Sequence, residues 1–178
     1  MRQKNIKYVN PEMLSARGVI THRGLIEFSH HPTYLEIGSG KGQFITALAR
    51  ENHQNHYVAL EVNQNVCYRI LEKKEADELH NLTIILGDAE HLLDYVKPHQ
   101  IDGIYLNFSD PWPKKKHHKR RLTAKKFLRM YQTLLKEGGF LQFRTDHQDF
   151  FMESMDDLDA YFDGVSFDLD LKPSAFMT

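Results

Sequence analysis

The feature that most constrains the fold is a regular alternation of short apolar runs with segments of helical periodicity. Four of the apolar runs read as strands, and they occupy residues 33–38, 57–62, 82–86 and 101–108. Continuous apolar strands separated by helices are typical of a parallel sheet that helices cover on both faces. The sequence therefore predicts an α/β fold built on a doubly wound, mostly parallel sheet.

The last third of the chain continues this pattern. Thr123 is a suitable N-cap for a helix whose buried face consists of Phe127, Leu128, Tyr131, Leu134 and Leu135. Gly138 and Gly139 would end that helix before a strand at residues 140–144, and another helix follows. Residues 165–171 alternate between apolar and polar side chains, which predicts an edge strand with one solvated face.

Length and composition favour a single soluble domain. A chain of 178 residues is long enough to bury roughly 70% of its unfolded surface. No apolar run approaches the roughly 20 residues that a membrane-spanning helix needs, so we expect no membrane association. The N-terminus lacks the apolar core of a signal peptide. The single cysteine, Cys67, excludes an internal disulfide framework, and we expect a cytoplasmic protein.

The first part of the chain is distinguished by its charge. Residues 1–24 contain five Lys or Arg residues and one acid, Glu12, and we interpret them as a basic arm. Such an arm either is mobile and becomes ordered on RNA or is a frayed terminus. Residues 25–178 would form the domain itself.

Charge is also distributed unevenly in the second half, although the formal net charge is −1. Between Lys114 and Lys126 there are eight Lys or Arg residues and no acid. From Asp146 to Thr178 there are nine Asp or Glu residues and one basic residue, Lys172. This separation indicates that one surface attracts a polyanion while another repels it, although most basic runs are solvated loops.

Acidic residues stand at the ends of the first three predicted strands, where ligands bind in sheets of this kind. Glu36 precedes a turn that contains Gly38 and Gly40. Glu61 ends the second strand, and Asp88 follows the third. Three acids suit a ligand that carries positive charge and hydroxyl or amine donors, such as S-adenosylmethionine, and they suit a pyrophosphate badly. Each acid alone is also compatible with an exposed strand end that binds nothing, but the three acids together favour a ligand.

The glycine turn itself is a weak signal. A dinucleotide fingerprint, Gly-x-Gly-x-x-Gly, would need glycine where Gln43 stands, which disfavours a nicotinamide oxidoreductase. Leu35 and Gly42 exclude a P-loop. What remains is a turn that allows a ligand to lie against the backbone.

Five short segments, in order, resemble the TrmB family of bacterial tRNA (guanine-N7)-methyltransferases. They are EIGSGKG, VALEV, GDAE, NFSDPWPKKKHHKRRL and FRTD, between Tyr34 and Asp146. The first is shared in outline by many methyltransferases, whereas FSDPWPKKKHHKRRL is far more specific. The resemblance implies a class I fold, S-adenosylmethionine as the methyl donor, and transfer to N7 of guanosine in the variable loop of tRNA.

The resemblance also implies roles for individual residues. Asp110 would be the catalytic residue. Contacts to the donor would come from Glu36, Gly38, Gly40, Glu61, Asp88, Ala89 and Asp110. The guanosine would be held by Lys114, Asp146 and Thr178. The tRNA would be contacted by Lys116, His117, His118, Lys119, Arg120 and Arg121.

The sequence departs from the family pattern at its end. Family members continue with a Thr-Glu-Tyr-Glu motif and a final strand that inserts beside residues 165–171. Here the sequence stops at FMT, where Thr178 would be the first residue of that motif. We therefore expect a sheet that lacks its last strand, with either an incomplete sequence or impaired substrate binding.

Methylation at N7 makes modest demands on a protein. N7 of neutral guanine already carries a lone pair, so no general base is needed. Alignment with the donor methyl group and tolerance of the cation that forms on the purine are the requirements. A carboxylate such as Asp110 can accept hydrogen bonds from N1 and N2 of guanine and stabilise that charge. Pro111 and Pro113 stiffen its turn, and Trp112 is placed either to stack on a base or to anchor the loop.

The sequence is also compatible with two other functions. One is a methyltransferase of the same fold that acts on another RNA or on a protein. Another is a donor-binding RNA-binding protein without turnover.

The 11 histidines show neither a Cys-x-x-Cys nor a His-x-x-x-His pattern, so we expect no metal. Cys67 lies among core residues of a helix and reads as structural, and the protein would be a monomer or a homodimer.

Overall fold

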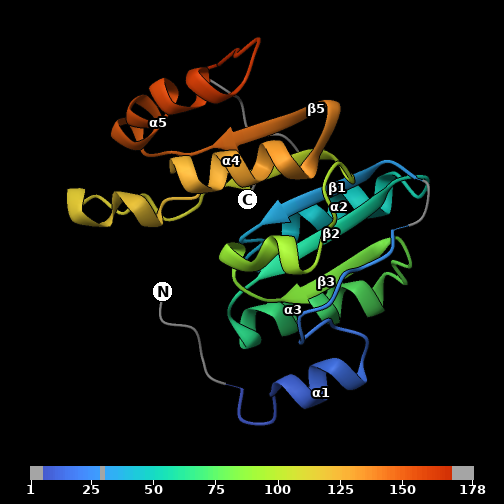
Figure 1. Ribbon diagram of the computed structural model, residues 1–178. Coiled ribbons are helices and arrows are strands. Elements are labelled where there is room, and N and C mark those ends of the chain that lie inside the picture. The colour runs from blue at the N-terminus through green and yellow to red at the C-terminus, as the bar shows by residue number, and fades with distance from the viewer. Residues whose placement is uncertain (1–5, 29–30, 170–178) are drawn as a thin grey trace.

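The computed structural model describes residues 6–28 and 31–169, and they form a five-stranded sheet with helices on both faces (Figure 1). The spatial order of the strands is β3-β2-β1-β4-β5, and every pairing is parallel. The strands are β1 (Thr33–Ile37), β2 (His56–Glu61), β3 (Leu82–Leu86), β4 (Ile101–Asn107) and β5 (Leu135–Arg144). The predicted doubly wound α/β fold is confirmed.

Two hydrophobic cores, one on each face, hold the sheet between its helices. Alternate residues of a strand point to opposite faces, so Tyr57 and Ala59 lie in one core while Val58 and Leu60 lie in the other. The first core is completed by α1 (Pro11–Ala16), α2 (Gln43–Glu51) and α3 (Gln64–Ala76). The second is completed by the 3-10 helix η1 (Ala89–Asp94), α4 (Lys125–Leu134) and α5 (Gln148–Tyr161).

The start of α4 differs from the sequence prediction. Its N-cap is Ala124, which offers no side-chain hydrogen bond to the helix, and not Thr123. The Thr123 hydroxyl is buried instead and forms a 2.8 Å hydrogen bond with the Ser154 hydroxyl of α5. Thr123 therefore joins two helices, a role that depends on tertiary contact and is invisible in a local cap pattern.

The junction of α4 and β5 is also shifted. The helix ends at Leu134, and Leu135 is already paired with Ile101 of β4. The register then breaks, and regular pairing resumes where Gly103 faces Phe140. A Cβ atom at Gly103 would lie 2.4 Å from the Phe140 ring, so any other residue there would displace that ring. Gly138, with φ of +75°, turns the chain within this irregularity.

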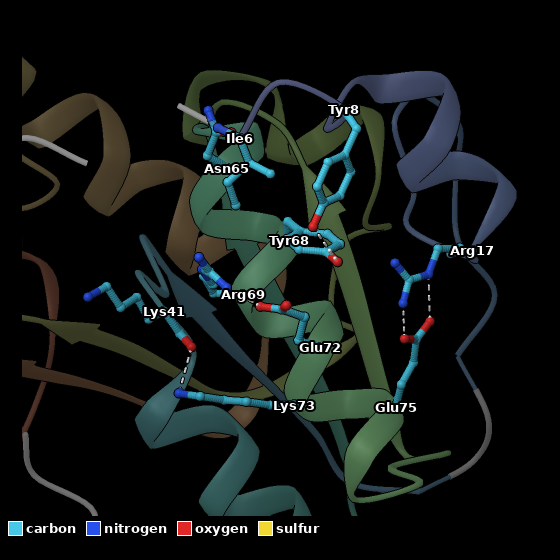
Figure 2. Close-up of polar contacts among 10 residues, drawn as sticks. All are labelled: Ile6, Tyr8, Arg17, Lys41, Asn65, Tyr68, Arg69, Glu72, Lys73 and Glu75. Carbon is cyan, nitrogen blue, oxygen red and sulfur yellow. Dashed lines mark hydrogen bonds and ion pairs between the residues drawn. The ribbon is translucent and has the colours of Figure 1, made fainter. Parts of the chain in front are cut away.

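The N-terminal segment from Ile6 to Ile20 is packed on the domain (Figure 2). Ile20 pairs with the edge strand β3 next to Ile85, and Leu14 of α1 is fully buried. The Tyr8 and Tyr68 hydroxyls lie 3.2 Å apart, and Arg17 forms an ion pair with Glu75 of α3 (Figure 2). These contacts hold the segment against the domain, while residues 1–5 lie outside the described part.

The predicted edge strand at residues 165–171 is also not observed where the structure can test it. Residues 165–169 are described and have no strand pairing, whereas residues 170 and 171 lie outside the described part. Alternation alone did not suffice, because a strand forms only where a neighbouring strand supplies its hydrogen bonds. None of the described helices is long and apolar enough to cross a membrane.

Candidate functional site at the carboxyl edge of the sheet

All five strands point the same way, so their carboxyl ends meet at one edge of the sheet. Most of the predicted site residues belong to the segments at this edge. Each strand contributes one acid at or near its end, and in chain order these are Glu36, Glu61, Asp88, Asp110 and Asp146. The predicted donor-site and guanosine-site acids therefore all lie in segments at this one edge of the sheet.

Glu36 is the most deeply buried of these acids, with 3% of its surface exposed. Its Oε1 accepts a 2.8 Å hydrogen bond from Nδ2 of Asn107, at the end of the adjacent strand β4. Its Oε2 is buried and has no hydrogen-bond partner among the described residues. Burial raises the pKa of Glu36 to about 7, and the nearby charge of Glu61 acts in the same direction. Because buried acceptors are nearly always hydrogen-bonded, this oxygen indicates a position where a ligand could supply a hydrogen-bond donor.

Glu61 holds the neighbouring loops together. Its Oε2 accepts a 2.9 Å hydrogen bond from the Gly40 amide, and its Oε1 accepts one of the same length from the Asn63 amide. Burial raises the pKa of Glu61, and the charge of Asp110 adds to the effect. The two carboxylates therefore lie close enough to repel one another, although they are 49 positions apart in the sequence. Like charges gathered at a strand edge favour a cationic ligand.

The glycine turn after β1 has the backbone that its sequence predicts. Gly38, Gly40 and Gly42 all have positive φ, which glycine adopts at no steric cost. A Cβ atom at Gly42 would lie 2.9 Å from Ile70 of α3, whereas Gly40 faces open space. Lys73 of α3 donates a 2.9 Å hydrogen bond to the carbonyl of Lys41 and fixes the turn from behind (Figure 2). The turn thus leaves room for a ligand beside Gly40.

Asp88 and Ala89 lie after β3. The Asp88 side chain is exposed, and its Oδ1 accepts a 2.9 Å hydrogen bond from the Glu90 amide as the N-cap of η1. Ala89 is the first residue of η1 and is partly buried. Asp88 therefore caps η1 and still remains exposed at the same edge of the sheet.

The segment after β4 has a strained backbone. Phe108 and Trp112 have φ of +51° and +42°, values that side chains other than glycine rarely adopt. Asp110 lies between them and is exposed. The Trp112 ring packs edge-on against His117 at 5.7 Å, and the Arg120 guanidinium lies 5.0 Å from its centre. Strain of this kind concentrates at functional sites, where surrounding contacts hold it.

The predicted guanosine-binding residues lie partly at this edge. Asp146 follows β5, whose last residue, Arg144, is paired with Asn107 at the end of β4. Asp146 and Lys114 are both exposed. The register therefore brings the segments carrying Asp110 and Asp146 to adjacent strand ends. Thr178, the third predicted residue, lies outside the described part of the chain.

The basic segment, residues 114–121, contains the short 3-10 helix η2 (Lys115–Arg120), drawn in yellow in Figure 1. Lys116, Lys119 and Arg120 are exposed, and His117 and His118 are partly buried. A cavity of about 630 Å³ lies between this segment and the first turn of α4, with Glu153, Ser154 and Asp157 of α5 in its wall. Exposed cations on a short helix are well placed to contact an extended polyanion.

Arg121 differs from the other cations of the basic segment, because its partners lie within the protein. Only 7% of its surface is exposed. Its Nε donates a 2.6 Å hydrogen bond to the Pro111 carbonyl, and its Nη1 lies 2.6 Å from Oε2 of Glu153. A guanidinium committed to these partners is not free to bind a phosphate.

Sequence reasoning missed Asn107 and Ser39. Asn107 holds Glu36 through its amide, and its own Oδ1 is buried without a hydrogen-bond partner among the described residues. The Ser39 hydroxyl is buried and donates a 3.0 Å hydrogen bond to the Glu36 carbonyl. The available signal was a polar residue at the end of an otherwise apolar strand, which a buried sheet rarely tolerates without a partner.

Two further features bear on what the site can hold. The described residues contain no group of three or more His, Cys, Asp or Glu side chains that could hold a metal ion. Cys67 is fully buried, and burial raises the pKa of its thiol to about 12, so it stays an unreactive thiol in the core.

Comparison with known proteins agrees with this geometry. The protein family described as "Putative methyltransferase" matches residues 30–177. A tRNA (guanine-N(7)-)-methyltransferase of Lacticaseibacillus casei (strain BL23) is 41% identical over 177 residues, which cover 95% of this chain and 82% of the relative. A protein of the same name from Staphylococcus carnosus (strain TM300) is 45% identical over 141 residues, which cover 78% and 67%.

Solved structures resemble the fold at lower identity. A SAM-dependent methyltransferase from Aquifex aeolicus has a TM-score of 0.57 and 16% identity, and the match covers 86% of this chain and 79% of that one. This likeness concerns the fold alone. The family match, together with two relatives at 41% and 45% identity, shows that the chain belongs to this methyltransferase family.

Proposed function

We propose that this protein transfers a methyl group from S-adenosylmethionine to N7 of guanosine in tRNA. The observation that carries this proposal is at the carboxyl edge of the sheet. Glu36 and Glu61 are buried there without an ion pair among the described residues, and the chain leaves β4 through Asp110 into the exposed basic segment. The names of the relatives at 41% and 45% identity give the same reaction. A cluster of acids at the strand ends, together with a neighbouring polycationic segment, suits a cationic small molecule and a polyanionic partner.

The donor fits the residues at this edge. The buried Oε2 of Glu36 has no partner among the described residues and can accept from an ammonium or hydroxyl group. Glu61 would receive the ribose hydroxyls while it keeps its amide contacts, because a carboxylate accepts about four hydrogen bonds. Gly38 and Gly40 leave the backbone open for close approach, and Asp88 with Ala89 would meet the adenine. When bound, the donor supplies an electrophilic methyl group on a positively charged sulfur.

Asp110 is the proposed catalytic residue. N7 of guanine already has a lone pair, so the protein must align it with the methyl group and accommodate the positive charge that develops on the purine. The Asp110 carboxylate, on a strained turn directly after β4, would accept hydrogen bonds from the guanine edge and oppose that charge. Lys114 and Asp146 would complete the guanosine contacts, with Thr178 as a third candidate.

The basic segment would hold the tRNA backbone. Lys116, His117, His118, Lys119 and Arg120 are the proposed contacts, and Arg121 is left out because its guanidinium is buried. Contacts to phosphates position a nucleic acid and contacts to bases select the site, which separates the tasks of this segment and of Asp110. Methylation in the variable loop, a cytoplasmic location and a monomeric or dimeric state remain predictions.

Nucleoside analysis after reaction with a labelled donor tests this function. The protein is incubated with S-adenosylmethionine that carries an isotopic methyl label and with unmodified tRNA, and the digested nucleosides are separated by mass. Labelled 7-methylguanosine is the expected product. A different methylated nucleoside, or label transferred to protein, would point to another methyltransferase substrate. Donor and tRNA binding without any transfer would point to a binding protein.

A further inference from the structure

Arg121 is the one buried cation in the basic segment, and its contacts lead to the catalytic turn. A charged side chain is costly to bury unless strong partners replace water. Arg121 has two, since Nε donates to the Pro111 carbonyl and Nη1 pairs with Glu153, each at 2.6 Å. Its guanidinium also lies 4.9 Å from the centre of the Phe150 ring in α5. The side chain is thus held in a fixed position between two elements.

The turn at the other end of this contact has few hydrogen bonds to its main chain, although the Trp112 ring packs against His117 and Arg120. The Asp110 turn, residues 109–113, includes Trp112 in the left-handed region. Among the described residues, the Arg121 Nε contact is the one hydrogen bond that reaches the main chain of this turn. The turn therefore depends on Arg121 for its connection to α5.

We propose that Arg121 is a positioning residue, which fixes the Asp110 turn to α5 through Pro111 and Glu153 and so sets the place of the Asp110 carboxylate. This proposal rests on the proposed function, and it gives Arg121 a role in the rate of transfer and not in RNA affinity. A lysine cannot replace it, because a single ammonium lacks the planar fork that reaches both partners. A displacement of about 1 Å at a catalytic group can lower a rate about 100-fold.

Arg121→Lys tests the proposal with two readouts. At saturating donor and tRNA, kcat should fall about 10- to 100-fold while the KM for tRNA changes less than about twofold. Trp112 is the single tryptophan of the chain and lies in the turn itself, so its fluorescence reports the turn without methyl transfer. Quenching of Trp112 by acrylamide should increase in the variant because the turn is released.

Two comparisons make the result specific. Arg129→Lys, an exposed substitution of the same kind on α4, should leave kcat and Trp112 quenching at parental values. Lys119→Ala, in the proposed RNA contact, should raise the KM for tRNA. If Arg121→Lys instead raises the KM for tRNA and keeps the parental kcat, Arg121 is an RNA contact and the proposal is overturned.

Glu153→Gln keeps the test valid if Arg121→Lys does not fold. Glu153 is half exposed, and the change removes the charge that anchors Arg121 while Arg121 itself remains. A smaller fall in kcat and a smaller rise in quenching are expected. Parental kcat and quenching in this variant would overturn the proposal. A parent without any methyl transfer to tRNA would refute the proposed function, yet Trp112 quenching would still decide whether Arg121 holds the turn.

Discussion

Single carboxylates at the sheet edge are the residues on which the proposed chemistry depends. Glu36, Glu61 and Asp110 form no ion pair among the described residues. Glu61 lies close enough to Glu36 and to Asp110 for their charges to repel, and Glu36 and Glu61 are buried. Such an arrangement costs stability in the free protein and is relieved when a cation binds. We therefore expect Glu61 to contribute to donor binding and Glu36 to make stability depend on pH.

Glu61→Ala should weaken binding of S-adenosylmethionine by about 1–3 kcal/mol, the usual range for the loss of charged hydrogen bonds. Part of the effect would arise because Gly40 and Asn63 lose the carboxylate that holds their amides. Isothermal titration calorimetry measures the change. Glu137→Ala, an exposed substitution in β5, serves as the control and should bind like the parent. Parental affinity in Glu61→Ala would remove Glu61 from the donor site.

Glu36 should make the stability of the free protein depend on pH. Its pKa is raised from 4.5 to about 7 by burial, so the folded protein binds this proton more tightly than the unfolded chain. The stability it contributes is therefore fully present below pH 4.5 and is lost as the pH rises toward 7. The total change is about 3 kcal/mol.

The comparison that isolates this effect is Glu36→Gln, which keeps the shape of the protonated acid. Thermal unfolding at several pH values should show the variant gaining stability relative to the parent between about pH 5 and about pH 8. A difference in Tm that does not change with pH would mean that Glu36 does not titrate in this range.

At the scale of elements, η2 and the Asp110 turn separate two tasks. The exposed cations of η2 attract phosphates, whereas Arg121 turns inward and connects the turn to α5. Local sequence did not distinguish Arg121 from its neighbours, because its burial depends on Glu153, which lies 32 positions away. The affinity for tRNA and the rate of transfer should therefore be separable by mutation.

Neutralising Lys116, Lys119 and Arg120 together should weaken tRNA binding and flatten its dependence on salt. The slope should fall by roughly 0.7–0.9 for each phosphate that the variant no longer neutralises. Donor affinity should stay at the parental value, since none of the three belongs to the proposed donor site. Lys97→Ala, on a cation paired with Glu27, is the control. A salt slope equal to that of the parent would mean that η2 is a solvated surface.

The elements also show what the sequence could predict. The first four strands were recovered to within one residue at each end because apolar runs between glycines and caps are local signals, whereas β5 begins at Leu135 and not at residue 140. The grouping of the strand-end acids could also be predicted, because parallel strands in one sheet have their carboxyl ends at the same edge. Asn107 holding Glu36 and Ile20 pairing with Ile85 were not predicted, because each depends on which segments meet in space. The strand prediction for residues 165–169 failed for the same reason.

Across the whole molecule, the basic segment and the acidic edge flank the same turn. A polyanion that approaches is attracted by η2 and repelled by the carboxylates. Among the groups of a nucleic acid, only a neutral one such as a base can therefore enter the acidic edge without an electrostatic cost. Asp110 stands at the boundary of these two surfaces. The central claim is therefore that the Asp110 carboxylate stabilises the positive charge that develops on a guanine bound at this boundary.

Formation of 7-methylguanosine in a single turnover, compared between the parent and Asp110→Asn, tests that role most directly. Saturating donor and tRNA remove differences in binding, and the asparagine keeps the shape of the side chain without its charge. The parent should form 7-methylguanosine, and the variant should form it about 100-fold or more slowly, the scale expected when preorganised electrostatic stabilisation is removed. The affinity for tRNA should hardly change, because phosphate contacts dominate it. Equal rates in the two proteins would contradict the catalytic role of Asp110, and a parent that forms no 7-methylguanosine would contradict the function.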